Sequence, residues 1–222
     1  MSADDALLSP EEQAEYFAAA EKVQNTVASH LRANPNKTFA IAFVSNLQRS
    51  VDSISQAAIN QGKRFDCRAG CSHCCNVQVE ALEPEIFQIA HELKKLPSLE
   101  LTALIERLQQ HAILAKDLSV QDHRIPCPLL KDNLCSIYPV RPAACRKVHS
   151  YDVAKCKTQA SEIPESLEVI LKSEALMKGT AEAYRQVSLP AYGHELGQAL
   201  LLALTDETAE ARWYSGLAVF VK

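Results

Sequence analysis

Apolar residues recur every three to four positions along most of the chain, the pattern of amphipathic helices that pack on a common core. In the first sixty residues this pattern predicts two helices. The first begins at a capping box formed by Ser9 and Glu12, has Pro10 at its first position, and ends at the Asn-Pro-Asn turn at 34–36. The second ends at Gly62, and its apolar face consists of Ile41, Val44, Leu47, Val51, Ile54 and Ala58. We interpret both helices as scaffold.

The remainder of the chain predicts further helices and very little extended structure. Helical periodicity recurs from Pro84 onward and over 96–118, 164–187, 194–204 and 206–214, whereas 77–82 is a short extended candidate. We therefore expect a mainly α fold, a compact helical domain with a small β-hairpin and a cysteine-rich metal-binding centre. We expect a single domain over 1–222 with three parts, namely an N-terminal helical pair at 1–62, a cysteine-cluster core at 63–158 and C-terminal helices at 159–222.

The composition is that of an ordinary globular protein. The 222 residues are 47% hydrophobic and 23% charged, and a net charge of −4 gives no whole-molecule reason to expect nucleic acid or an anionic membrane as partner. The longest apolar runs, 39–44 and 199–204, are far shorter than the ~20 residues that span a bilayer. The acidic N-terminus lacks the basic region of a secretory signal. We expect a soluble, cytoplasmic protein.

The eight cysteines are strongly clustered. None occurs in the first 66 or the last 66 residues, and four fall within the nine residues 67–75. A reducing compartment disfavours structural disulfides, and clustering disfavours eight unrelated buried thiols. Soft thiolates suit zinc or iron. The candidate metal ligands are therefore Cys67, Cys71, Cys74, Cys75, Cys127, Cys135, Cys145 and Cys156.

Local structure is expected to bring these thiols together. The polar turn Lys131-Asp132-Asn133 predicts a tight hairpin over 127–138, which would hold Cys127 and Cys135 near each other at its open end. Pro142 then favours a helix start, and no Gly or Pro interrupts 143–163. On one continuous helix, four potential ligands would lie within about 60° of arc: Cys145, His149, Asp152 and Cys156.

The first cluster allows two conformations. In a helix, Cys67, Cys71 and Cys74 would share a face, but Gly70 disfavours a helix, and a tight loop that ends in a helical turn would also let the sulfurs converge. Segments 63–75 and 123–157 carry net charges of +2 and +5, which would lower thiol pKa values. A nucleic-acid surface is disfavoured, because aromatic residues are few and zinc-finger spacing is absent.

The spacing Cys-x3-Cys-x2-Cys-Cys, followed by Cys-Pro-Leu-Leu and by Cys-x-Ile-Tyr-x2-Arg-Pro-x2-Cys-Arg, resembles the YkgJ-type cysteine-cluster family. The resemblance covers about residues 65–157 and implies a zinc- or iron-chelating domain. A related cluster occurs in flagellin lysine N-methylases, which resemble iron–sulfur enzymes. Besides the eight cysteines, the matching residues are Pro128, Ile137, Tyr138, Arg141, Pro142 and Arg146.

Three function classes remain open at this point. The first is a metal-binding protein that holds iron, as an iron–sulfur cluster, or zinc. The second is an iron–sulfur enzyme or electron carrier related to cluster-containing protein methylases. The third is a thiol redox protein that uses Cys71 and Cys74 as a Cys-x-x-Cys pair. We favour iron, because the adjacent Cys74 and Cys75 could serve two irons or two sites. The spacing of the first three cysteines also matches radical S-adenosylmethionine enzymes, but a nearly all-helical chain lacks their partial barrel.

Several neighbouring side chains are interpreted as supports. His73 and His149 are expected to orient ligands by hydrogen bonds more than to bind metal themselves. Asp152 could ligate iron or orient a neighbouring cation. Tyr138 and Arg141 are expected to pack on the hairpin and to pair with a carboxylate. The metal ion is the expected partner, and the sequence identifies no protein partner, substrate, oligomeric state or number of metal ions.

Overall fold

A computed structural model describes residues 8–68 and 70–220 and confirms a mainly α fold. Within these residues, four short strands form two separate antiparallel pairs, β1 (Glu80–Leu82) with β4 (Gly193–Glu195) and β2 (Leu130–Lys131) with β3 (Leu134–Cys135). The 3-10 turns η1 (His73–Asn76) and η2 (Tyr138–Val140) lie within the cysteine region. The helices are α1 (Pro10–Ala33), α2 (Lys37–Phe43), α3 (Ser45–Asn60), α4 (Glu83–Leu93), α5 (Ser98–Ala115), α6 (Ala143–Lys147), α7 (Val153–Lys157), α8 (Leu167–Gln186), α9 (Leu196–Thr205) and α10 (Ala209–Tyr214).

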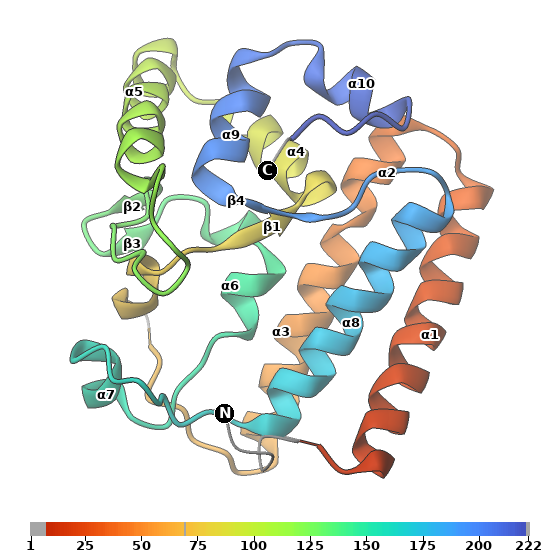
Figure 1. Cartoon of the computed structure of the whole chain (residues 1–222), viewed down its shortest axis with the longest axis vertical. Helices are drawn as coiled ribbons and strands as arrows, with labels where there is room; N and C mark the ends of the chain where they lie inside the picture. Colours follow the sequence, from red (N-terminus) through yellow and green to blue (C-terminus); the bar gives the residue numbers. More distant parts are fainter. Residues whose placement is uncertain (1–7, 69, 221–222) are drawn as a thin grey trace.

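Helix α1 begins where the sequence predicts. The Ser9 N–H donates to Glu12 Oε2 at 2.8 Å and the Glu12 N–H donates to Ser9 Oγ at 3.2 Å, so the capping box is formed. The second predicted helix is interrupted at Val44, which separates α2 from α3. Figure 1 shows α1, α3 and α8 side by side as one bundle. Gly179 lets α1 and α8 approach closely, because a Cβ there would lie 2.3 Å from Ala20 O.

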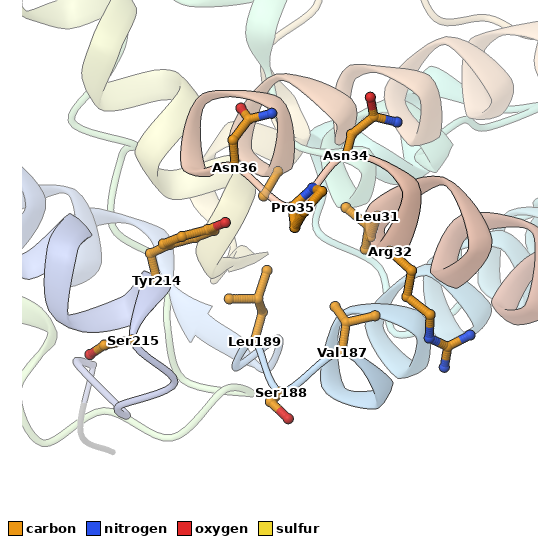
Figure 2. A pocket seen from close by; sticks show the side chains of 11 residues that line it. Leu31, Arg32, Asn34, Pro35, Asn36, Val187, Ser188, Leu189, Tyr214 and Ser215 are labelled. Carbon is orange, nitrogen blue, oxygen red and sulfur yellow. The ribbon is translucent and has the colours of Figure 1, made fainter.

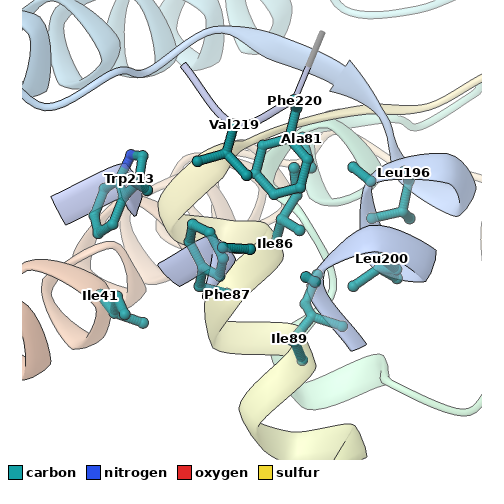
Figure 3. Packing of buried hydrophobic residues seen from close by; sticks show 14 of the residues in the cluster. Ile41, Ala81, Ile86, Phe87, Ile89, Leu196, Leu200, Trp213, Val219 and Phe220 are labelled. Carbon is teal, nitrogen blue, oxygen red and sulfur yellow. The ribbon is translucent and has the colours of Figure 1, made fainter. Parts of the chain in front are cut away.

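Helix α4 lies at the centre of the main hydrophobic core. Its Ile86, Phe87 and Ile89 are almost fully buried, and Figure 3 shows them facing side chains from α9, α10 and the C-terminal segment. The ring centroid of Phe87 lies 5.3 Å from that of Trp213 and 5.5 Å from that of Phe220. Residues distant in sequence therefore cover the helix that follows the first cysteine segment.

Strands β1 and β4 form a contact that the sequence does not predict. Extended structure at 77–82 is expected and is found at its last three residues, but the partner strand lies more than a hundred residues away. Just beyond the pairing, Glu83 accepts hydrogen bonds from Tyr192 N–H at 2.6 Å and shares a 2.9 Å hydrogen bond with His194. The starts of α4 and α9 are thereby fixed beside each other.

The cysteine-rich segments form one side of the molecule. In Figure 1, α6 lies next to α3, the β2–β3 hairpin lies below α5, and α7 lies at the lower left. In the part of the chain that the structure describes, no helix is long and apolar enough to cross a membrane.

Candidate metal centre

The first cysteine segment is a loop that ends in a helical turn. Gly70 has φ +83°, a left-handed conformation that ends any helix there, so the loop alternative holds and the helical one is wrong. The Cys71 N–H donates to Arg68 O at 2.9 Å and the Cys75 N–H donates to Ser72 O at 2.9 Å. These two turns fold the segment back on itself, so that its cysteines lie close together in space.

The second segment begins with the predicted hairpin. Asp132 and Asn133 have φ of 52° and 60°, the positive pair that a two-residue type I′ turn requires. The pairing sets Leu130 opposite Cys135, and the Leu130 N–H donates to Cys127 O at 2.9 Å. Cys127 and Cys135 therefore lie close together at the open end of the hairpin, which confirms the prediction.

The hairpin is joined directly to the first cluster. The Cys127 N–H donates to Cys75 O at 2.7 Å, and the Ser72 hydroxyl donates to Asn133 Oδ1 at 3.2 Å. Both ends of the hairpin thus contact the loop that carries Cys71, Cys74 and Cys75. This contact brings cysteines more than fifty residues apart in sequence into one region.

The continuous helix predicted over 143–163 is wrong. Helix α6 ends after five residues, α7 begins six residues later, and the connecting chain is extended. Its backbone is hydrogen-bonded to other segments: Asp66 N–H donates to Ser150 O at 2.8 Å, and Tyr151 N–H donates to Pro164 O at 2.9 Å. Because these groups are engaged across the chain, they are unavailable for helical hydrogen bonds.

The predicted stripe of four ligands is dispersed by this break. His149 is buried, and its ring nitrogens bond to the backbone, with Nε2 accepting from Ser166 N–H at 2.7 Å. Asp152 caps α7, because its Oδ1 accepts hydrogen bonds from the N–H groups of Ala154 and Lys155. Both side chains therefore shape the backbone, while Cys145 and Cys156 lie on separate short helices.

A buried carboxylate fixes the helix that carries Cys145. Glu85 is 1% exposed, and its two oxygens accept from Ala143 N–H at 2.7 Å and from Leu82 N–H at 3.2 Å. Ala143 is the first residue of α6, so Glu85 satisfies a helix N-terminus that would otherwise be unpaired. Burial raises the pKa of Glu85 above its ordinary value.

A buried guanidinium fixes the other end of α6. Arg146 donates to Arg141 O at 2.8 Å and to Pro139 O at 2.6 Å, and it pairs with Asp52 of α3. Arg141 also pairs with Asp52, at 3.7 Å, and its guanidinium lies 3.7 Å from the centre of the Tyr138 ring. The expectation that Arg141 pairs with a carboxylate is confirmed, whereas packing of Tyr138 and Arg141 on the hairpin stays a prediction.

Five thiols gather where the hairpin meets α6 and η1. Burial raises the pKa of Cys127 to about 11. Burial also raises the pKa of Cys145, and the neighbouring thiols of Cys127, Cys74 and Cys135 raise it further. A hydrogen bond between the adjacent side chains raises the pKa of Cys74 and lowers that of Cys75. Burial also raises the pKa of Cys135, an effect that two nearby guanidinium groups oppose.

A second gathering of thiols forms between the first loop and α7. Partial burial raises the pKa of Cys67, and the neighbouring thiols of Cys71, Cys74 and Cys156 raise it further. Helix α7 packs against η1, and its Val153 N–H donates to Asp66 Oδ2 at 3.0 Å. The side chain of Cys74 is thus near members of both gatherings.

The chemistry of this donor set fits a soft metal. All eight cysteines are described and all are free thiols. Across the ranges 8–68 and 70–220, however, no three His, Cys, Asp or Glu side chains already stand in position to hold a metal ion. The segments are short, with loops between them, and metal binding commonly completes the folding of such cysteine-rich sites.

Histidines outside the cysteine region pair with carboxylates: His91 with Glu210 at 2.5 Å, His111 with Glu195 at 3.3 Å and His194 with Glu83 at 2.9 Å. Glu85 and Asp52 are the functional supports that the sequence does not single out. The role of Glu85 could have been inferred from its position, three residues after Leu82 and next to Pro84, which is typical of the first turn of a helix. No sequence pattern indicates the role of Asp52.

A cavity among the described residues lies away from the cysteines. It encloses about 500 Å³ between the ends of α1, α8 and α10, with Leu31, Val187 and Leu189 as its apolar floor, and Figure 2 shows Tyr214 pointing into it. A smaller cavity of about 200 Å³ lies between α3 and α8. Neither cavity is lined by a cysteine.

Comparison with known proteins finds a likeness in the cysteine-rich region. Residues 66–167, just under half of the chain, match the model of the CxxCxxCC family, described as "Putative zinc- or iron-chelating domain". The match confirms the resemblance inferred from the cysteine spacing and supports metal binding by this region. No curated protein and no solved structure matches the chain.

Proposed function

We propose that this protein binds iron through its cysteines, as an iron–sulfur cluster, in preference to zinc. The observation that carries the proposal is the convergence of Cys127, Cys135 and Cys145 on the Cys74–Cys75 pair of a distant loop. Four thiolates are the usual ligand set of such a cluster. The free thiols favour a reducing compartment, the cytoplasm, as its location.

The adjacent pair Cys74–Cys75 favours iron over a single zinc ion. Neighbouring residues seldom both ligate one small tetrahedral ion, whereas a cluster presents several metal atoms to separate thiolates. A bound cluster would supply one-electron transfer. The role of the chain is to hold the thiolates and to compensate their charge, for which Arg141 and Arg146 lie close to Cys135.

Elemental analysis combined with an anaerobic visible spectrum tests the proposal. A brown protein with iron and acid-labile sulfide in equal amounts is the expected result. A colourless protein with stoichiometric zinc would overturn the iron assignment while leaving metal binding intact. If no metal is present and all eight thiols titrate freely, metal binding itself is refuted.

An electron carrier is the second candidate, and the exposure of Cys67 and Cys74 favours it. An exposed edge would bring a cluster within reach of a redox partner. Reversible bleaching by dithionite and return of the colour in air would support this role; a cluster that cannot be reduced without loss of iron would exclude it. A thiol redox role for Cys71 and Cys74 is disfavoured, because the described residues form helices and short antiparallel strand pairs, without the βαβ unit that carries a thioredoxin-like Cys-x-x-Cys pair.

A further inference from the structure

We infer that the eight cysteines form two adjacent four-thiol sites: an inner site of Cys75, Cys127, Cys135 and Cys145, and an outer site of Cys67, Cys71, Cys74 and Cys156. This inference rests on the proposed metal-binding function and specifies it further. The family description names the metals and leaves the number of sites open.

Backbone contacts define the inner site. The hairpin pairing sets Cys135 beside the turn that contains Cys127, and Cys127 N–H binds Cys75 O at 2.7 Å. Glu85 and Arg146 then hold the helix that carries Cys145 against the same region. The first cysteine loop, the hairpin and α6 thus contribute the four thiols of the inner site, all of which are partly buried.

Different contacts define the outer site. Asp66 binds the extended chain before α7 through Ser150 O, and binds the first turn of α7 through Val153 N–H. These two bonds place the loop that carries Cys67 and Cys71 against the helix that carries Cys156. Neither bond involves the hairpin or α6, so the two sites are supported by separate parts of the fold.

The break between α6 and α7 separates the sites. On the continuous helix that the sequence predicts, Cys145 and Cys156 would face one common centre. In the structure His149 and Ser166 fix the extended connection between the two helices, and each cysteine joins a different set of neighbours. Cys74 and Cys75 stand at the junction, one assigned to each site.

Titration of the reduced apoprotein with Co²⁺ tests the inference. Co²⁺ reports thiolate binding through its visible and near-ultraviolet bands and through the number of equivalents bound. We expect two equivalents for the wild type, one for Cys156→Ser, one for Cys145→Ser and none for the double variant. Lys155→Ala, exposed and one residue from Cys156, is the matched control and should retain two.

Alkylation of the Co²⁺-loaded variants, read by mass spectrometry, keeps the test decisive if one variant binds weakly. In Cys156→Ser the thiols of Cys67, Cys71 and Cys74 should become reactive while those of the inner site stay protected. One equivalent in the wild type, or simultaneous exposure of all thiols in either single variant, would overturn the two-site inference and leave the metal-binding proposal standing. A wild type that binds no Co²⁺ and no iron would instead refute the proposed function.

Discussion

Replacing Glu85 should show how much a buried carboxylate contributes to the metal centre. In Glu85→Leu the N–H groups of Ala143 and Leu82 lose their acceptors inside the protein. Each unpaired buried donor costs about 1–3 kcal/mol. We expect a loss of about 3 kcal/mol in the free energy of unfolding, after the gain from the added apolar surface. Glu85→Gln keeps one carbonyl acceptor and should lose only about 1 kcal/mol.

Urea unfolding followed by the fluorescence of Trp213, the single tryptophan, measures this difference. At a slope of about 2–3 kcal/mol/M, the midpoint for Glu85→Leu should fall by about 1 M. Glu92→Gln, on the exposed face of the same helix, is the control and should leave the midpoint unchanged within error. The metal content should also fall in Glu85→Leu, because α6 carries Cys145. A midpoint equal to that of the wild type would refute the role given to Glu85.

The same carboxyl predicts a pH dependence with a definite sign. Burial raises the pKa of folded Glu85 above its ordinary value of 4.5, so the folded state holds its proton to higher pH than the unfolded state. Its contribution to stability is therefore present below about pH 4.5 and lost as pH rises through the folded pKa. The stability of the wild type relative to Glu85→Gln should decrease as pH rises above 4.5. An increase would contradict this reasoning.

Three further substitutions test other contacts. Asp52→Asn removes the carboxylate that pairs with buried Arg146 and should cost about 1–2 kcal/mol in denaturant unfolding, since Asp52 itself is partly exposed; no change would mean that the backbone carbonyls hold Arg146 alone. Gly179→Ala places a methyl against Ala20 O and should lower the melting temperature by several degrees, unless α1 can shift freely. Asn133→Val is strained at φ 60° and should destabilise the hairpin and weaken Co²⁺ binding. Asn133→Gly keeps the turn and loses the exposed hydrogen bond from Ser72, so it should bind Co²⁺ more tightly than Asn133→Val; equal binding by the two variants would argue against a role for the turn.

Local sequence patterns predict the local elements well. Ser9 and Glu12 specify the start of α1, and Asp132-Asn133 specifies the hairpin turn, because each signal and the backbone groups it satisfies lie within a few residues. The gathering of Cys127 with Cys135 follows from that turn. These features needed no knowledge of the rest of the fold.

The failed predictions depend on partners distant in sequence. The helix over 143–163 contains no Gly or Pro, yet backbone bonds to Asp66 and Pro164 and the buried His149 hold its middle extended. The pairing of β1 with β4 likewise joins two segments whose own sequences give only a weak extended signal. A periodicity argument cannot detect such contacts, because it reads each segment alone.

The packing of helix α4 shows that the residues matched by the family model are fewer than the residues needed for a stable fold. The helix lies within the matched range 66–167, but Phe87 packs on Trp213 and Phe220, which lie outside that range. A fragment cut at the family boundaries would expose Ile86, Phe87 and Ile89 to water, at about 1.5–3 kcal/mol for each side chain. We expect such a fragment to aggregate when expressed alone. The cysteine-rich segment could then be transferred to another protein only together with the helices that pack around it.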